Sequence, residues 1–90
     1  MSRGWGGNRA RALTLATLER YGSTCHLCGR EGATTADHVI PRSHGGPDTL
    51  DNLRPAHSRC NSARGNMSLA RWFELHPLDM SRRAPPSRDW

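Results

Sequence analysis

The 90-residue sequence contains no lysine, one residue each of phenylalanine, tyrosine, valine and isoleucine, and three cysteines. Three cysteines cannot all pair within one chain, so a disulfide framework of the secreted type is excluded. The sequence also has no long apolar run and no secretory signal. These absences argue against a membrane protein and predict a reducing, cytoplasmic location.

The scarcity of large apolar residues limits the size of the core. Hydrophobic residues make up 34% of the chain, and the mean hydropathy is −0.77. A domain near this size buries only about 60–65% of the surface of its unfolded chain, so it usually needs a disulfide or a metal ion for stability. We therefore expect one small domain stabilised by a metal, and zinc fits a reducing cytosol best.

The charge of the chain is strongly positive. Thirteen arginines face eight acidic residues, which gives a net charge of +5 and a pI of about 10.5. A small basic protein is attracted to polyanions, and arginine forms bidentate contacts with phosphate. The charge therefore favours a nucleic acid as the partner.

Two pairs of residues have the spacing of a four-ligand zinc site. Cys25-x-x-Cys28 supplies two thiolates, and His57-x-x-Cys60 repeats the spacing with one imidazole. Together they predict a closed Cys3His tetrahedron with a structural zinc ion. His26 lies inside the first pair, where its backbone position directs it away from the ion. The alternatives are free structural cysteines and a catalytic role for His57.

The first half of the chain predicts one helix and one strand. The helix runs from Asn8 to about Tyr21, and Gly22 ends it. Its packing face contains Ala12, Leu15 and Leu18. The strand covers residues 34–40, and a turn at 45–48 follows it.

The second half predicts a second strand and two further helices. Asp48 or Thr49 begins a helical turn that reaches Asn52, and the strand covers residues 53–56. One helix runs from Ser58 to about Gly65, and the last runs from Ser68 to about His76. The last helix has a core stripe at helical spacing, formed by Leu69, Trp72, Phe73 and His76.

Composition divides the chain into three parts. Residues 1–7 are rich in glycine and are expected to form a flexible arm. Residues 8–76 are expected to form the folded domain. Residues 77–90 contain several arginines and prolines and are expected to be a disordered basic tail that contacts DNA.

Several linked motifs between residues 21 and 66 resemble the HNH endonuclease family. They occur in the order and approximate spacing of the family: Cys25-x-x-Cys28, the segment from Asp37-His38 to Gly45-Gly46, Asn52-Leu53, Cys60-Asn61 and Arg64-Gly65-Asn66. The resemblance implies an α+β protein with a small ββα-metal fold, stapled by the Cys3His zinc and flanked by N- and C-terminal helices. The family's usual final histidine is Asn61 here, and its frequent third zinc cysteine is His57.

The resemblance also implies roles for four residues. His38 resembles the general base that activates the attacking water, and Asp37 and Asn61 resemble the ligands of one divalent cation. Asn52 corresponds to the asparagine that orients the loop and thereby the base. One carboxylate and one amide oxygen form a hard ligand set, which favours Mg2+ or Mn2+ over zinc. Because Asp37 and His38 are adjacent, they would face opposite sides of a regular strand, so the strand must break or twist there.

Other basic residues are candidates for DNA contacts. Arg64 lies three residues after Asn61 on the same helix face, so both side chains could contact the same phosphate. Cys60 is turned about 100° away from Asn61, toward the zinc. The remaining candidates are Arg42, His44, Arg54 and Arg59. The sequence contains no recognisable motif for hydrogen bonding to the base edges of DNA. Sequence-specific cleavage would therefore require a partner protein or contacts from the termini.

The sequence thus predicts a divalent-metal-dependent endonuclease that acts on double-stranded DNA. One site per chain implies nicking by a monomer or weak dimer, with 5′-phosphate and 3′-hydroxyl products. At this size the chain resembles the stand-alone HNH proteins of phages. We therefore expect a location in bacterial or phage-infected cytoplasm. The expected roles are genome packaging beside a phage terminase and restriction-like cleavage. The alternatives are a zinc-ribbon module that binds DNA without catalysis and a zinc-mediated protein interaction.

Overall fold

The centre of the fold is a short antiparallel hairpin of β1 (Thr35–His38) and β2 (Leu53–Ala56), seen in a computed structural model that describes residues 7–78. Thr35 pairs with Ala56, and His38 pairs with Leu53. The connection between the strands contains two 3₁₀ turns, η1 (Arg42–His44) and η2 (Leu50–Asn52). β2 has the predicted bounds. β1 is shorter than predicted because the chain bends after His38.

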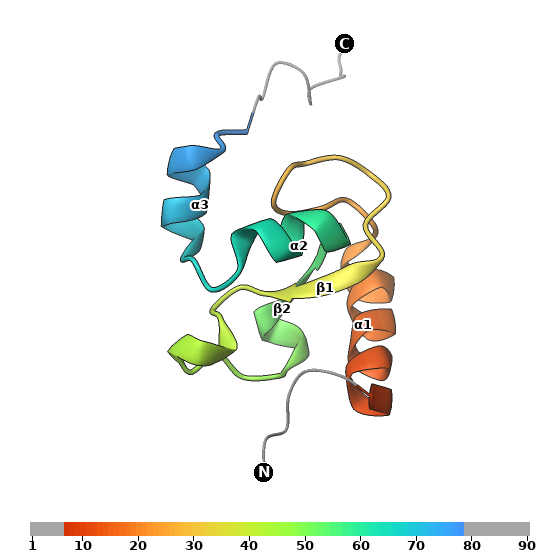
Figure 1. The fold of residues 1–90 in the computed structure, drawn as a ribbon. Coiled ribbons are helices and arrows are strands. Elements are labelled where there is room, and N and C mark those ends of the chain that lie inside the picture. The colour runs from red at the N-terminus through yellow and green to blue at the C-terminus, as the bar shows by residue number, and fades with distance from the viewer. Residues whose placement is uncertain (1–6, 79–90) are drawn as a thin grey trace.

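Three α-helices surround the hairpin (Figure 1). α1 (Gly7–Tyr21) contacts both strands and η2, and α2 (Ser58–Arg64) follows β2 directly. α3 (Leu69–Leu75) lies beyond α2. The ββα arrangement that the family resemblance implied is therefore present, with helices on either side of it in the chain.

The buried face of α1 differs from the predicted one. Leu15 is 61% exposed and Ala12 is also exposed, whereas Ala10 and Thr17 are buried and Leu18 is half-buried. The predicted face was therefore wrong at Ala12 and Leu15. Thr17 can be buried because its hydroxyl donates a hydrogen bond to the Leu13 carbonyl at 2.7 Å.

α3 packs against the segment between Cys25 and Cys28 through Trp72. The Ser68 hydroxyl accepts a hydrogen bond from the Arg71 backbone N–H, which caps the helix. Trp72 is buried, and its Nε1 donates to the Leu27 carbonyl at 2.9 Å. Leu69 and Phe73 pack against the core as predicted, but His76 is exposed and only stacks on the Trp72 ring.

The core is small, as the composition predicts. It consists of Cys25, Leu27, Ala33, Ala56 and Trp72, with partly buried neighbours that include two further cysteines. Within residues 7–78, none of the helices is long and apolar enough to cross a membrane. The predicted flexible arm, apart from Gly7, and the predicted tail from residue 79 onward lie outside the described residues.

Candidate active site

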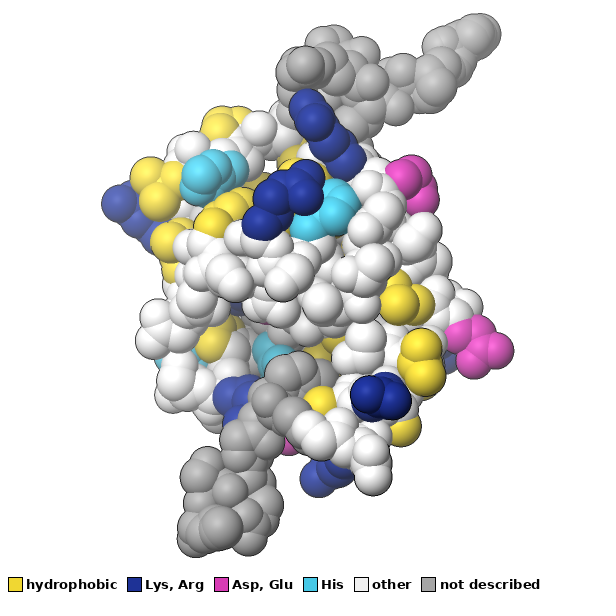
Figure 2. All heavy atoms as spheres, turned by 45° about the vertical axis from the view of Figure 1, so that its right-hand side comes forward, with side chains coloured by type: hydrophobic (Ala, Val, Ile, Leu, Met, Phe, Trp, Pro, Cys, Tyr) yellow, Lys and Arg dark blue, Asp and Glu magenta, His cyan; other side chains and the backbone are white. Residues whose placement is uncertain are grey.

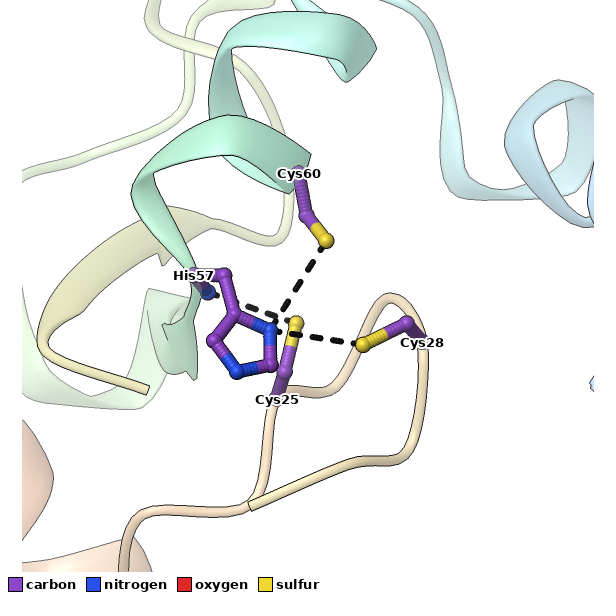
Figure 3. A group of neighbouring side chains, drawn as sticks. All are labelled: Cys25, Cys28, His57 and Cys60. Carbon is purple, nitrogen blue, oxygen red and sulfur yellow. Dashed lines mark hydrogen bonds between the residues drawn. The ribbon is translucent and has the colours of Figure 1, made fainter. Parts of the chain in front are cut away.

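Cys25, Cys28, His57 and Cys60 form one cluster, called here the Cys3His cluster (Figure 3). Their ligand atoms all lie within 4.8 Å of one another. The Cys28 and Cys60 sulfurs are 3.3 and 3.8 Å from His57 Nδ1. The four donors converge from the loop before β1 and from the start of α2. The expected set of four residues can therefore hold a tetrahedral zinc ion.

His57 is oriented for ligation by Nδ1. Its other ring nitrogen, Nε2, is 2.8 Å from the Glu31 carbonyl oxygen. Because a carbonyl only accepts hydrogen bonds, Nε2 carries the proton and Nδ1 keeps its lone pair. Metal-bound histidines are usually held in this way. This contact favours His57 as the fourth ligand over a catalytic role for it.

The three cysteines of the cluster affect the pKa values of one another's thiols. Burial, together with the charge of Cys25, raises the pKa of Cys60 to about 12. Burial acts in the same direction on Cys28, but hydrogen bonds from the Arg30 backbone and from Cys25 lower the pKa of Cys28 overall. Three thiolates this close repel one another, and a divalent cation at their centre would offset that repulsion.

Asp37 is a buried carboxylate with two donors on one oxygen. Its Oδ2 lies 2.9 Å from His26 Nε2 and 2.6 Å from Arg64 Nη1. The side chains of Asp37 and Arg64 are only 6% and 0% exposed. The guanidinium therefore neutralises the carboxylate inside the protein. Within residues 7–78, hydrogen bonds to Asp37 Oδ1 are absent.

The expected phosphate contact of Arg64 is contradicted by its burial. Besides Asp37, the guanidinium donates to the carbonyls of His38, Val39 and Met67 at 2.5–2.7 Å. The side chain thus joins the end of α2 to the end of β1. Asn61 and Arg64 do share one helix face, as predicted, but that face packs against the hairpin instead of facing solvent.

His38 lies at the last position of β1, where it contacts Asp48. His38 Nε2 is 2.8 Å from Asp48 Oδ1, and Arg42 Nε donates to the same oxygen at 2.9 Å. The hydrogen bond from His38, followed by the Arg42 interactions, lowers the pKa of Asp48 despite the opposing effect of burial. Asp37 and His38 thus contact different partners, as the alternation of a strand requires.

Asn52 holds the loop that follows His38. Its Oδ1 accepts from Ile40 N at 2.9 Å, and its Nδ2 donates to the carbonyls of Ile40 and Pro47 at 3.0 Å each. Gly46 lies against these groups, where a Cβ would stand 1.8 Å from the Ile40 oxygen. The three hydrogen bonds hold the loop after β1, and the close approach of the backbone requires glycine at position 46.

Asn61 is oriented toward β1. Its Nδ2 donates to the Ala36 carbonyl at 3.1 Å, which turns the amide oxygen the other way. The bond holds the Asn61 side chain beside the residue that precedes Asp37.

The remaining predicted DNA contacts are distributed over the surface. Arg59 and His44 are exposed, and Arg42 is partly committed to Asp48. Arg54 stacks on the Tyr21 ring at 4.1 Å and donates to the Leu53 and Asp51 carbonyls. Figure 2 shows arginine side chains at several separate places on one face, with acidic side chains near its edge.

Sequence reasoning missed two contacts. His26 was expected only to point away from the zinc, and the sequence offered no signal that it reaches Asp37. Asp48 was expected only as a turn or cap residue, yet it contacts His38. A carboxylate ten residues after the candidate base, across a Gly-Gly turn, is the signal that could have indicated this contact.

The comparisons with known proteins agree with the geometry. The family model described as HNH endonuclease matches residues 25–67, just under half of the chain. No match was found among curated proteins or among solved structures. The matched segment contains the Cys3His cluster, the β1–β2 hairpin and α2. Residues 25–67 are therefore similar to the HNH endonuclease family, in agreement with the motifs of the sequence.

Proposed function

We propose that this protein is a divalent-metal-dependent endonuclease that hydrolyses DNA phosphodiester bonds by water attack. The observation that carries the proposal is the contact of His38 with Asp48 at the end of β1, inside the HNH segment. HNH nucleases act on DNA, and the net charge of +5 favours the same substrate. The chemistry of each side chain supports a role in hydrolysis.

His38 is the proposed general base. An ionised carboxylate only accepts hydrogen bonds, so the contact with Asp48 places the imidazole proton on Nε2. The lone pair of the neutral ring is then on Nδ1, which is the atom that would remove a proton from water. Arg42 helps to keep Asp48 ionised through its own contact with Oδ1. Asn52 would keep the loop around the base in one conformation.

Asp37 and Asn61 are the proposed ligands of the divalent cation. A carboxylate oxygen and an amide oxygen are hard donors, and each has one oxygen without a hydrogen bond to residues 7–78. Mg2+ or Mn2+ held there with several waters would stabilise charge on the phosphoryl and leaving oxygens. The charge of Arg64 opposes that of Asp37, so we expect weak cation binding by the free protein and tighter binding with a phosphate present.

The Cys3His cluster has the proposed role of a structural zinc site. All four of its ligands would be protein side chains, which leaves no open coordination position for chemistry. The cluster holds the start of α2, and Asn61 lies one residue after Cys60. Zinc would therefore set the position of the Asn61 side chain relative to β1.

DNA would be held mainly through its phosphates. The proposed phosphate contacts are Arg42, His44, Arg54 and Arg59. Arg64 is not among them because it is buried. Such contacts are independent of sequence and weaken steeply as salt rises. One site per chain predicts nicking by the monomer, with 5′-phosphate and 3′-hydroxyl ends. Specificity supplied by a partner, such as a phage terminase, and restriction-like cleavage are extensions of the proposal.

A DNA-binding module without catalysis is the second candidate. The buried Arg64–Asp37 pair favours it, because a neutralised carboxylate attracts a cation less strongly. Such a module would use the zinc cluster and the arginines, but it would not need the contact between His38 and Asp48.

A plasmid-nicking assay separates the two candidates. Zinc-loaded protein is incubated with supercoiled DNA and a series of divalent cations, beside His38→Ala and the exposed-histidine control His76→Ala. We expect nicking with Mg2+ or Mn2+, a loss of about 10²-fold or more in His38→Ala, and little change in the control. Zinc content should be the same in all three proteins. Wild-type protein that binds DNA but nicks with none of the cations would favour the non-catalytic module.

A further inference from the structure

His26 links the zinc cluster to the proposed cation site. It lies between two residues of the cluster, Cys25 and Cys28, but its side chain points out of the cluster toward Asp37. Its backbone N–H donates to the Pro55 carbonyl at 2.9 Å, and its Nε2 lies 2.9 Å from Asp37 Oδ2. One residue of the cysteine loop therefore contacts both strands of the hairpin.

The contact with Asp37 has a defined polarity. Arg64 donates to the same carboxylate oxygen from α2, and this buried cation offsets the negative charge of Asp37. An ionised carboxylate only accepts, so His26 Nε2 must be the donor. The side chain of His26 is 16% exposed, which limits competition from water. Oδ2 thus receives hydrogen bonds from two different elements of the fold.

Two donors restrict Asp37 more than one donor does. With Arg64 alone, the carboxylate can still rotate about its Cβ–Cγ bond while one oxygen stays near the guanidinium. A second donor from another direction selects one orientation. In that orientation Oδ2 is occupied by hydrogen bonds and Oδ1 is left for another ligand.

We propose that His26 is a positioning residue that holds the Asp37 carboxylate with Oδ1 directed toward a divalent cation. The inference rests on the proposed function only in assigning Asp37 to a cation site. Because Cys25 and Cys28 place His26, zinc in the Cys3His cluster would support Asp37 through this residue. The zinc site would then affect cation binding as well as stability.

Removal of a residue that hydrogen-bonds a metal ligand typically weakens metal binding by about 10–100-fold. We therefore expect His26→Ala to weaken Mn2+ binding by about 10-fold. His26→Gln keeps an N–H donor of similar reach, so it should recover most of that loss. His76→Ala removes an exposed histidine just after α3 and should bind Mn2+ as the wild type does.

The experiment measures Mn2+ binding to the zinc-loaded full chain by electron paramagnetic resonance, without DNA. Zinc content, measured for each protein, should remain one ion per chain and shows that the variants are folded. The inference is overturned if His26→Ala binds Mn2+ like the wild type, if His26→Gln is as weak as His26→Ala, or if the wild type binds no Mn2+. A wild type that shows the expected binding differences but never nicks DNA would overturn the proposed activity alone.

Discussion

The guanidinium of Arg64 and the carboxylate of Asp37 form an ion pair 2.6 Å long that is almost entirely closed to solvent. Arg64 is also the largest fully buried side chain of the described residues. Arg64 therefore connects α2, which carries Cys60 of the Cys3His cluster, to β1, which carries Asp37 and His38.

Removal of Arg64 should be strongly destabilising. Arg64→Ala leaves the Asp37 charge buried with no cation beside it and three carbonyl groups without their donor. We expect a loss of about 3–5 kcal/mol in the free energy of unfolding, measured by urea denaturation of zinc-loaded protein. A variant that does not fold at all agrees with this expectation.

Arg71→Ala is the matched control, because Arg71 forms an exposed pair with Glu74. Its cost should stay below about 1 kcal/mol. Equal costs for the two variants would contradict the structural role of Arg64.

Zinc removal should unfold the protein. The apolar core is small, and zinc binding in comparable peptides contributes about 10–16 kcal/mol of apparent free energy at neutral pH. Circular dichroism should show loss of helix after chelation and recovery when zinc is returned. Because the pKa of Cys60 is raised in the metal-free cluster, zinc must displace a proton there, so zinc affinity should increase with pH. A chelated sample with an unchanged spectrum would contradict the prediction.

The sequence predicted the elements of this fold better than it predicted their side-chain contacts. Ligand spacing identified the four residues of the Cys3His cluster, and helical spacing indicated α1 and α3, because both kinds of spacing are local properties of the sequence. The burial of Arg64 was not local. It depends on carbonyls at the end of β1 that only the packed hairpin brings to α2. The His26 contact was missed for the same reason.

Replacement of Asn52 should disturb the loop after β1 without affecting the zinc cluster. Asn52→Ala removes an acceptor from Ile40 N and a donor shared by two carbonyls, in a buried position. We expect a loss of about 1–3 kcal/mol in the free energy of unfolding, and reduced nicking at conditions where the variant remains folded. Zinc content measures the integrity of the cluster. Asn66→Ala, at an exposed asparagine, should be nearly neutral, and an equal effect of both changes would argue against the role of Asn52.

Asp48 should make a pH-dependent contribution to stability. Its hydrogen bond with His38 lowers its pKa in the folded state. Its contribution is therefore fully present above the ordinary carboxyl pKa of about 3.9 and is lost as pH falls through the lowered folded-state value. Asp48→Asn keeps an oxygen acceptor but loses the charge, so it should cost about 1–2 kcal/mol near neutral pH.

The measurement compares urea denaturation of wild type and Asp48→Asn over a series of pH values. Zinc content is measured at each pH, and the comparison is limited to pH values at which both proteins keep their zinc and their fold. Within that range the difference should be full near neutral pH and begin to shrink as the pH falls toward about 4, because protonation removes the charge that the variant lacks. Asp51→Asn, at an exposed carboxylate three residues away, controls for the change in net charge. A difference in the free energy of unfolding that stays constant down to the lowest pH compared would mean that Asp48 acts through its shape alone. The inference that an ionised Asp48 carboxylate accepts a hydrogen bond from His38 would then be wrong.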